Sequence, residues 1–300
     1  MEEDIRNNFI KAGRISAEAL EYGKALIKKG ASLLDVTEKI EKKIFEIGAK
    51  PAFPVQISCD HIAAHFCPEQ NDKTILENQV VSLDLGVHVN GCIGDNAYTI
   101  DLSGRYSDLV KAAQKALDEA LKITQVGTTL REIGAAIQET ISSYGFVPVR
   151  NLSGHGLGIY DVHTKPTIPN FDNHDKTKIE NGMVFAIEPF ATTGAGIVHE
   201  AGIPTVFSFL QKRPVRSPIT REALMEIAKY ECLPFTTRWL TKKFGAKANF
   251  AMRELMQYDI IRSYPPLVEV NKGIVSQAEH SVLVDEDKVI VLTRHKIIPK

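Results

Sequence analysis

Two aspartates lie in a predicted β-hairpin whose other side chains are mostly apolar. Asn90-Gly91 separates the two strands, and this dipeptide is the strongest short-range signal for a two-residue hairpin loop. Such a loop sets Asp95 opposite Gly86 and Asp84 opposite Ala97, so both carboxylates project from one face as diagonal neighbours, about 7–8 Å apart. Burying them there is costly unless a cation lies between them, which favours metal ligation over a solvent-exposed sheet edge. A β-bulge beside Asp95 would shift this register.

Three further side chains have the chemistry of metal ligands. His155 is flanked by glycines, where the backbone turns sharply enough to present a ligand. Glu188 closes an apolar strand, where an unpaired carboxylate is costly. Glu279 precedes another apolar strand and, taken alone, is more typical of a salt-bridged strand end. His163 follows His155 by eight residues, about 26 Å in an extended strand. Either the glycines fold the chain back or His163 contacts the substrate.

A second group of histidines and cysteines has its own alternatives. His61 and His65 have the i, i+4 spacing of a zinc-protease helix, but that motif requires Glu beside the first His, where Ile62 stands. Cys59, His61, His65 and Cys67 are spaced more tightly than the usual zinc-finger ligands, so a zinc knuckle is the less favoured interpretation.

The elements that must position these residues occur twice. A pattern of seven residues recurs at an offset of 97 positions. It consists of a glycine, four apolar residues with helical spacing, a glycine that closes the helix and a proline after it. Gly30, Leu33, Val36, Ile40, Ile44, Gly48 and Pro51 match Gly127, Leu130, Ile133, Ile137, Ile141, Gly145 and Pro148. We therefore predict one domain over residues 1–300, of class α/β (α+β), built from two halves related by a pseudo-twofold axis. A site on that axis would draw residues from both halves.

Residues 208–264 differ from the rest of the chain in pattern and charge. They predict three helices, at 221–230, 236–244 and 249–261, and contain 11 Lys/Arg against 5 Asp/Glu, a net charge of +6. The remaining residues carry 25 against 32, a net charge of −7. We predict a helical insertion here, and we favour a solvated basic face over contact with nucleic acid.

The composition of the whole chain excludes several classes of protein. Its 300 residues are 44% hydrophobic and 24% charged with a formal net charge of −1, which is unlike a protein that coats nucleic acid or membrane. No apolar run approaches the roughly 18 residues of a membrane span, and the acidic start, Met1–Asp4, is unlike a secretory signal. Four cysteines do not make a disulfide framework. We expect a monomer in the reducing cytoplasm.

The motifs around these residues resemble those of the type II methionine aminopeptidases. Five strings occur in that family's order over nearly the whole chain: Ala63-Ala64-His65, Ser82-Leu83-Asp84-Leu85-Gly86, Asn151-Leu152-Ser153-Gly154-His155-Gly156, Ala186-Ile187-Glu188-Pro189 and Tyr264-Pro265-Pro266-Leu267. The resemblance implies a duplicated "pita-bread" fold, in agreement with the internal repeat, and a winged-helix-like insertion that matches residues 208–264. The short amino terminus is similar to that of archaeal members.

The resemblance also implies a metal centre. Two divalent ions, of Co, Mn, Fe or Zn, would be bound by Asp84, Asp95, His155, Glu188 and Glu279. Asp95 and Glu279 would bridge the two ions. A water between the metals would be the nucleophile, and Glu188 would be the general base that accepts its proton.

The remaining site residues implied by the resemblance contact the substrate. His65 would hydrogen-bond the scissile amide nitrogen and His163 the carbonyl oxygen as negative charge develops on it. Phe53, Val162 and Tyr264 would line the methionine pocket. Ala278 stands where relatives carry a bulky aromatic side chain, so the pocket beside Glu279 is expected to be roomier.

The implied function is removal of the initiator methionine from a nascent polypeptide when the second residue is small. The expected partner is the nascent amino terminus, with transient ribosome contact and neither a membrane nor stable nucleic-acid binding. Prolidase and aminopeptidase P share the fold and ligands but usually carry a separate amino-terminal domain, and only about 50 residues precede Phe53. Non-catalytic relatives that bind ribosomes or nucleic acid have lost ligands, whereas all five remain here. Peptidase activity without RNA would separate an enzyme from such a binding module.

Overall fold

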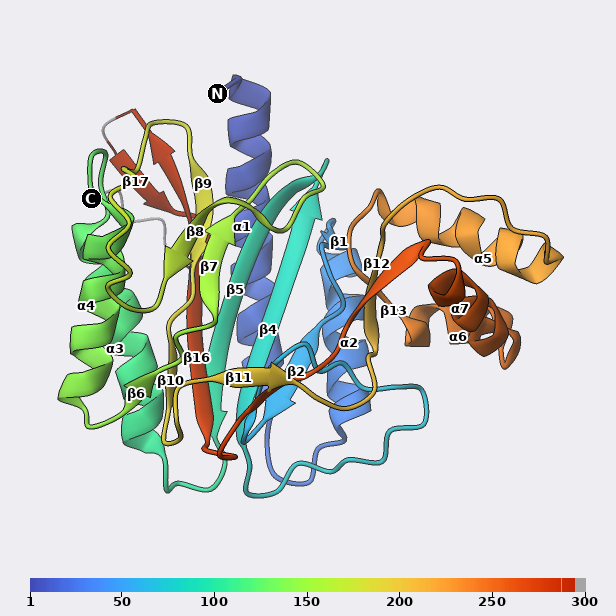
Figure 1. Ribbon diagram of the computed structural model, residues 1–300, viewed down its shortest axis with the longest axis horizontal. Coiled ribbons are helices and arrows are strands. Elements are labelled where there is room, and N and C mark those ends of the chain that lie inside the picture. Colours follow the sequence, from blue (N-terminus) through green and yellow to red (C-terminus); the bar gives the residue numbers. More distant parts are fainter. Residues whose placement is uncertain (287, 295–300) are drawn as a thin grey trace.

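Figure 1 shows the computed structural model of the chain, which describes residues 1–286 and 288–294. Four helices pack against a central sheet, and a smaller helical unit lies beside it, in orange at the right of the view. The four helices are α1 (Glu3–Leu26), α2 (Leu33–Glu46), α3 (Ser107–Ile123) and α4 (Leu130–Ser143). Among the described residues, no helix combines the length and the apolar composition that crossing a bilayer requires.

The described residues form a central sheet of eleven strands in which neighbours run antiparallel. Its main path is β1 (Lys50–Pro51), β4 (Val80–Val89), β5 (Cys92–Asp101), β16 (Val275–Asp285), β9 (Val184–Ile187), β7 (Ser153–Gly156) and β8 (Thr164–Pro169). Four short strands pair beside this path: β2 (Gln56–Cys59), β6 (Val147–Pro148), β10 (Phe190–Thr192) and β17 (Lys288–Val291). The two halves of the chain meet where β5 lies beside β16 (Figure 1).

The internal repeat is confirmed in the backbone. α2 and α4 begin and end 97 residues apart, and β1 and β6 keep the same offset. Both helices are capped by a hydroxyl residue. Before α2, Ser32 Oγ accepts from the backbone N–H of Asp35, and before α4, Thr129 forms a capping box with Glu132, in which the Glu132 carboxylate accepts from the backbone N–H of Thr129. The glycines before and after these helices have the positive φ angles that a left-handed turn requires: Gly30 84°, Gly48 84°, Gly127 90° and Gly145 81°.

The predicted hairpin of β4 and β5 is confirmed residue by residue. Asp84 lies opposite Ala97 and Asp95 lies opposite Gly86, and the ladder continues without a bulge. Apolar side chains of β4, such as Leu83 and Leu85, point to the other face and are buried against α1 and α2. The period-two alternation of the strand therefore separates a polar face from the helix-covered face.

The stretch 208–264 contains three α-helices, as expected, with different limits. They are α5 (Pro218–Ile227), α6 (Thr237–Phe244) and α7 (Lys247–Gln257), with the short helix η1 (Ala228–Tyr230) after α5. α5 begins earlier than predicted because Ser217 caps it and Pro218 occupies its first turn. α7 ends earlier because Ile261 is buried in a strand.

These helices share a core of their own with a small sheet. Its strands are β12 (Val206–Phe209), β13 (Phe235–Thr236) and β14 (Ile261–Tyr264). A second small sheet, of β3 (Ile62–Ala64), β11 (Val198–Glu200) and β15 (Leu267–Glu269), crosses in front of the central sheet (Figure 1). Chain segments from both small sheets therefore lie close to the polar face of the central sheet.

The contact between α1 and β5 leaves no room for a side chain at Gly94. A Cβ atom there would lie 2.6 Å from the Cα and N atoms of Gly13. We expect Gly94→Ala to lower the free energy of unfolding by about 1–3 kcal/mol, because backbone or helix must shift. Urea unfolding measures this, with Lys11→Ala on the exposed side of α1 as the control. An unchanged unfolding midpoint for Gly94→Ala would contradict the close approach.

Candidate metal centre

Three acidic residues lie on one face of three adjacent strands. Ala97 of β5 pairs with Asp84 of β4 on one side and with Glu279 of β16 on the other. Asp95 lies two residues before Ala97, so its side chain projects from the same face. The paired register therefore gathers residues from both halves of the chain on either side of Ala97.

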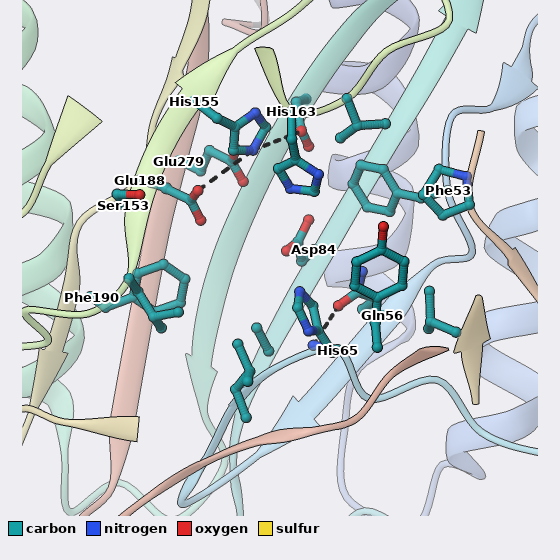
Figure 2. A pocket seen from close by; sticks show the side chains of 18 of the residues that line it. Phe53, Gln56, His65, Asp84, Ser153, His155, His163, Glu188, Phe190 and Glu279 are labelled. Atoms are coloured by element: carbon teal, nitrogen blue, oxygen red, sulfur yellow. Dashed lines mark hydrogen bonds and ion pairs between the residues drawn. The ribbon is translucent and has the colours of Figure 1, made fainter. Parts of the chain in front are cut away.

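His155 and Glu188 complete the cluster from the second half. The Nε2 atom of His155, on β7, lies 3.5 Å from Oε1 of Glu188 and 3.9 Å from Oδ2 of Asp95. Within residues 1–286 and 288–294, one group of metal-ligand side chains has its donor atoms all within 4.8 Å of one another: Asp95, His155 and Glu279. Figure 2 shows His155, Glu188, Glu279 and Asp84 converging on one space. The structure thus brings together all five predicted ligands.

The buried carboxylates of this cluster repel one another when ionised, and a bound cation would offset that repulsion. Burial raises the pKa of Asp84 to about 7 and, together with repulsion between the carboxylates, raises the pKa values of Asp95, Glu188 and Glu279 well above their usual range. The Oδ1 atoms of Asp84 and Asp95 are buried and have no hydrogen-bond partner among residues 1–286 and 288–294. Four carboxylates and one imidazole form an oxygen-rich donor set that suits divalent cations, so the residues present fit the metals implied above.

The imidazole of His155 is in the state that metal ligation requires. Burial, and then the neighbouring His163, lowers the pKa of His155 to about 3. The ring is therefore neutral at pH 7, with a nitrogen lone pair free to bind a metal.

Gln277 belongs to the site and was missed in the sequence. Its Nε2 donates to Oδ2 of Asp84 at 3.2 Å and to Oε2 of Glu188 at 3.4 Å, and its side chain is buried. Gln277 precedes Glu279 by two residues in β16, so the alternation of that strand places both on one face. That spacing was a usable signal.

The predicted substrate residues line one cavity beside the carboxylates. The cavity has a volume of about 230 Å³ and opens over the ligand cluster (Figure 2). All five predicted residues contribute to its wall: Phe53, His65, Val162, His163 and Tyr264. Residues that the sequence had not marked also line it, among them Gln56, Phe190, Val206, Pro234 and Leu267. The cavity joins a polar floor to largely apolar walls.

The two histidines that are predicted to contact the substrate, His65 and His163, are held in different ways. The backbone N–H of His65 donates to Oε1 of Gln56 at 2.6 Å, and its ring meets the ring of Tyr264 edge to face at 5.7 Å. The ring of His163 packs against that of His155, with 4.4 Å between centroids. The chain therefore folds back between His155 and His163. Burial lowers the pKa of both substrate histidines, to about 4 for His65, so both are neutral at pH 7.

One expectation, on Ala278, is wrong, and the less favoured zinc knuckle is not supported. Cys59, His61, His65 and Cys67 form no metal cluster in the described part of the chain, because His65 faces the cavity and Cys67 is buried beside the guanidinium of Arg238. Ala278 does not widen the substrate pocket. It lies opposite Tyr98, on the face of β16 away from Glu279, and packs against the helices.

Comparisons with known proteins agree with this geometry. The model of Metallopeptidase family M24 matches residues 7–232. The methionine aminopeptidase of Archaeoglobus fulgidus is 43% identical over 296 residues, which cover 98% of this chain and 100% of that protein. The methionine aminopeptidase of Saccharolobus solfataricus is 39% identical, with 98% of this chain and 99% of that protein covered.

Solved structures share the fold at lower identity. A thermophilic Arx1 superimposes with a TM-score of 0.85 at 16% identity, covering 97% of this chain and 91% of that chain. Methionine aminopeptidase from Thermotoga maritima gives 0.71 at 23% identity, with 98% of both chains covered. Prolidase from Pyrococcus furiosus gives 0.59 at 21% identity, with 98% of this chain and 65% of that chain covered. The predicted duplicated fold is therefore confirmed.

The buried carboxylates make the stability of the metal-free protein depend on pH. The pKa of Asp84 is about 7 in the folded chain, against an ordinary value of 3.8. The folded chain keeps a proton that the unfolded chain has lost, so this contribution to stability falls as the pH rises from about 4 through about 7. The unfolding free energy of the wild type minus that of Asp84→Asn should therefore decrease over this range, by at most about 1.4 kcal/mol per pH unit.

Urea unfolding of chelator-treated protein measures the difference between the wild type and Asp84→Asn. The buried histidines affect the stability of both proteins in the same way, so their opposite pH dependence cancels in this difference. Asp4→Asn, at an exposed position, is the control. Excess Mn²⁺ should remove the trend, because a bound cation keeps the carboxylates ionised in the folded chain. A difference that stays constant from pH 4 to pH 7 in metal-free protein would refute the raised pKa.

Proposed function

The chain belongs to metallopeptidase family M24, and we propose that it is a type II methionine aminopeptidase. It removes the initiator methionine from nascent polypeptides when the second residue is small. The observation that carries this function is the set of four carboxylates and one imidazole at the floor of an apolar cavity. The relatives named methionine aminopeptidase, which match over nearly their full length, support the same function.

We propose that the site holds two divalent ions. Asp84, Asp95, His155, Glu188 and Glu279 would bind them, with Asp95 and Glu279 shared by both. Such ions supply a water of lowered pKa and polarise the scissile carbonyl group. The mutual repulsion of the carboxylates and the two unpartnered oxygens support this assignment.

The residues of the chain would then orient the substrate and move protons. Glu188 is the general base that accepts a proton and passes it to the leaving amine. Gln277 donates to Glu188 and keeps that carboxylate turned into the site. His65 and His163 are both neutral at pH 7. His65 would hydrogen-bond the scissile amide nitrogen, and His163 would donate a ring N–H to the carbonyl oxygen as negative charge develops on it.

The cavity walls explain the choice of methionine. Phe53, Val162 and Tyr264 present apolar surface to an unbranched thioether side chain. We propose that residues 208–264 form an inserted unit that completes this wall, since Pro234 and Tyr264 reach the cavity from that segment. The substrate's second residue would lie among the histidines and carboxylates, where a large side chain clashes.

The shared ligand Asp95 offers a direct test of the metal assignment. Asp95→Asn should lose bound metal and peptide cleavage together, because one carboxylate serves both ions. Elemental analysis of the purified variant gives metal per chain, and cleavage of Met-Ala-Ser gives activity. Asp108→Asn, on the exposed side of α3, is the matched control. Normal turnover with both metals bound in Asp95→Asn would sink the assignment.

A peptide panel tests the substrate class. Met-Ala and Met-Gly peptides should be cleaved about 10- to 200-fold faster than Met-Lys or Met-Phe peptides, because a misfitting group typically costs about 1–3 kcal/mol. The measurement is kcat/KM for each peptide with purified enzyme in Mn²⁺ and without RNA. Xaa-Pro dipeptides lacking methionine should be poor substrates. Best cleavage of those dipeptides would replace this function with that of a prolidase.

A further inference from the structure

The loop that carries two substrate residues rests on the turn of the β4–β5 hairpin. Residues 157–163 connect β7 to β8 and include Val162 and His163. The backbone N–H of Tyr160 donates to the carbonyl of Gly91 at 2.9 Å, and Ile159 pairs with Cys92 in an antiparallel bridge. The hairpin that carries Asp84 and Asp95 therefore also supports this loop.

The side chain of Tyr160 lies in a space beside the hairpin turn, between Gly91 and His88, which forms the seat of this ring. Its ring meets the ring of His88 edge to face, with 5.3 Å between centroids. A Cβ atom on Gly91 would lie 2.5 Å from Cδ2 of Tyr160, so only glycine leaves space for the ring. The N–H of Gly91 donates to Nδ1 of His88 at 3.2 Å, which fixes the imidazole against the turn. Burial lowers the pKa of His88 to about 4, so this nitrogen is free to accept at pH 7.

Short contacts connect this seat to His163. Tyr160 has a φ of 56°, a conformation that a tyrosine keeps only where its surroundings hold it. The next residue, Asp161, accepts from Gly158 N–H through its carbonyl at 2.8 Å and from His163 N–H through Oδ1 at 3.3 Å. Val162 is buried in the apolar cluster that contains Phe53. Each residue from Tyr160 to His163 is thus held either by a backbone hydrogen bond or by apolar packing.

We propose that Tyr160 is a positioning residue for His163 and Val162. Seated on Gly91 and His88, its ring fixes the loop to the strand pair that bears Asp84 and Asp95. The hairpin thereby sets the separation between the metal ligands and the substrate wall. The catalytic consequence rests on the function proposed above, whereas the structural coupling does not.

Peptide cleavage and loop protection are measured on the same variants. Tyr160→Ala should lower kcat for Met-Ala-Ser about tenfold or more with unchanged metal content, because small displacements of a catalytic group are costly. Tyr160→Phe keeps the ring and should stay within about twofold of wild type. The double variant Tyr160→Ala/His163→Ala should have about the same kcat as His163→Ala alone, since His163 is the loop residue that acts on the scissile bond, whereas the displaced Val162 changes methionine binding and therefore KM.

Hydrogen exchange of the resting enzyme gives a readout that needs no substrate. The amides of residues 157–163 should exchange faster in Tyr160→Ala and at the wild-type rate in Tyr160→Phe. Gly91→Ala should reproduce the defect of Tyr160→Ala, since its Cβ would occupy the ring's seat. Gly48→Ala is the matched control, because Gly48 has a φ of 84° and open space around its Cβ position.

Each outcome decides between the proposals. Additive losses in the double variant, an equal defect in Tyr160→Phe, or unchanged loop exchange in Tyr160→Ala would each overturn the role of Tyr160. Equal effects of Gly91→Ala and Gly48→Ala would overturn the seat on the turn. A wild type that leaves methionyl peptides intact would refute the proposed function, and the exchange data would still decide whether Tyr160 holds the loop.

Discussion

Four carboxylates share one buried face of the sheet and repel one another. The rest of the structure depends on this electrostatic repulsion being offset. Burial removes most of their contact with water, and no lysine or arginine of the described chain lines the cavity. A pair of divalent cations is the simplest species that neutralises such a set. Each carboxylate comes from a different strand or strand end, so a slip of one residue in any pairing would turn a carboxylate towards the helices. Strand register is therefore a functional constraint as well as a structural one.

The duplication explains how this register is maintained. β5 and β16 meet at the junction of the two halves, and each half covers its own part of the sheet with a pair of helices. On the helix side, the contact of Gly13 with Gly94 allows α1 to lie directly on β5. On the opposite side, Ala97 pairs with both Asp84 and Glu279 and so sets the two carboxylates on one face. Close packing on one face and the pairing register on the other thus fix the same strand.

Local chemistry decided which parts of this arrangement could be predicted from the sequence. Asn90-Gly91 sets the hairpin register, and capped helices between left-handed glycines identify the repeat, because both signals act within a few residues. The positions of Gln277 and Ala278 could also have been predicted from the sequence. Because side chains alternate along a strand that contains Glu279, Gln277 lies on the same face as Glu279 and Ala278 lies on the face that packs against the helices. Pro234 could not be found in this way, because its place in the cavity depends on how a distant segment packs.

The charge of that distant segment has a structural explanation where it meets α2. Arg238 is fully buried and makes two hydrogen bonds to the carboxylate of Glu41, at 2.7 and 2.9 Å. Lys242 pairs with Glu38 at 2.8 Å, one turn away on the same helix. Arg238 also donates to the carbonyl of Pro68, three residues after His65, at 3.0 Å. Part of the excess of basic residues in 208–264 thus complements the acidic remainder of the chain. Removing one partner of a buried ion pair typically costs about 3–5 kcal/mol. The contacts of Arg238 with Glu41 and with Pro68 therefore connect residues 208–264 firmly to α2 and to the segment that presents His65.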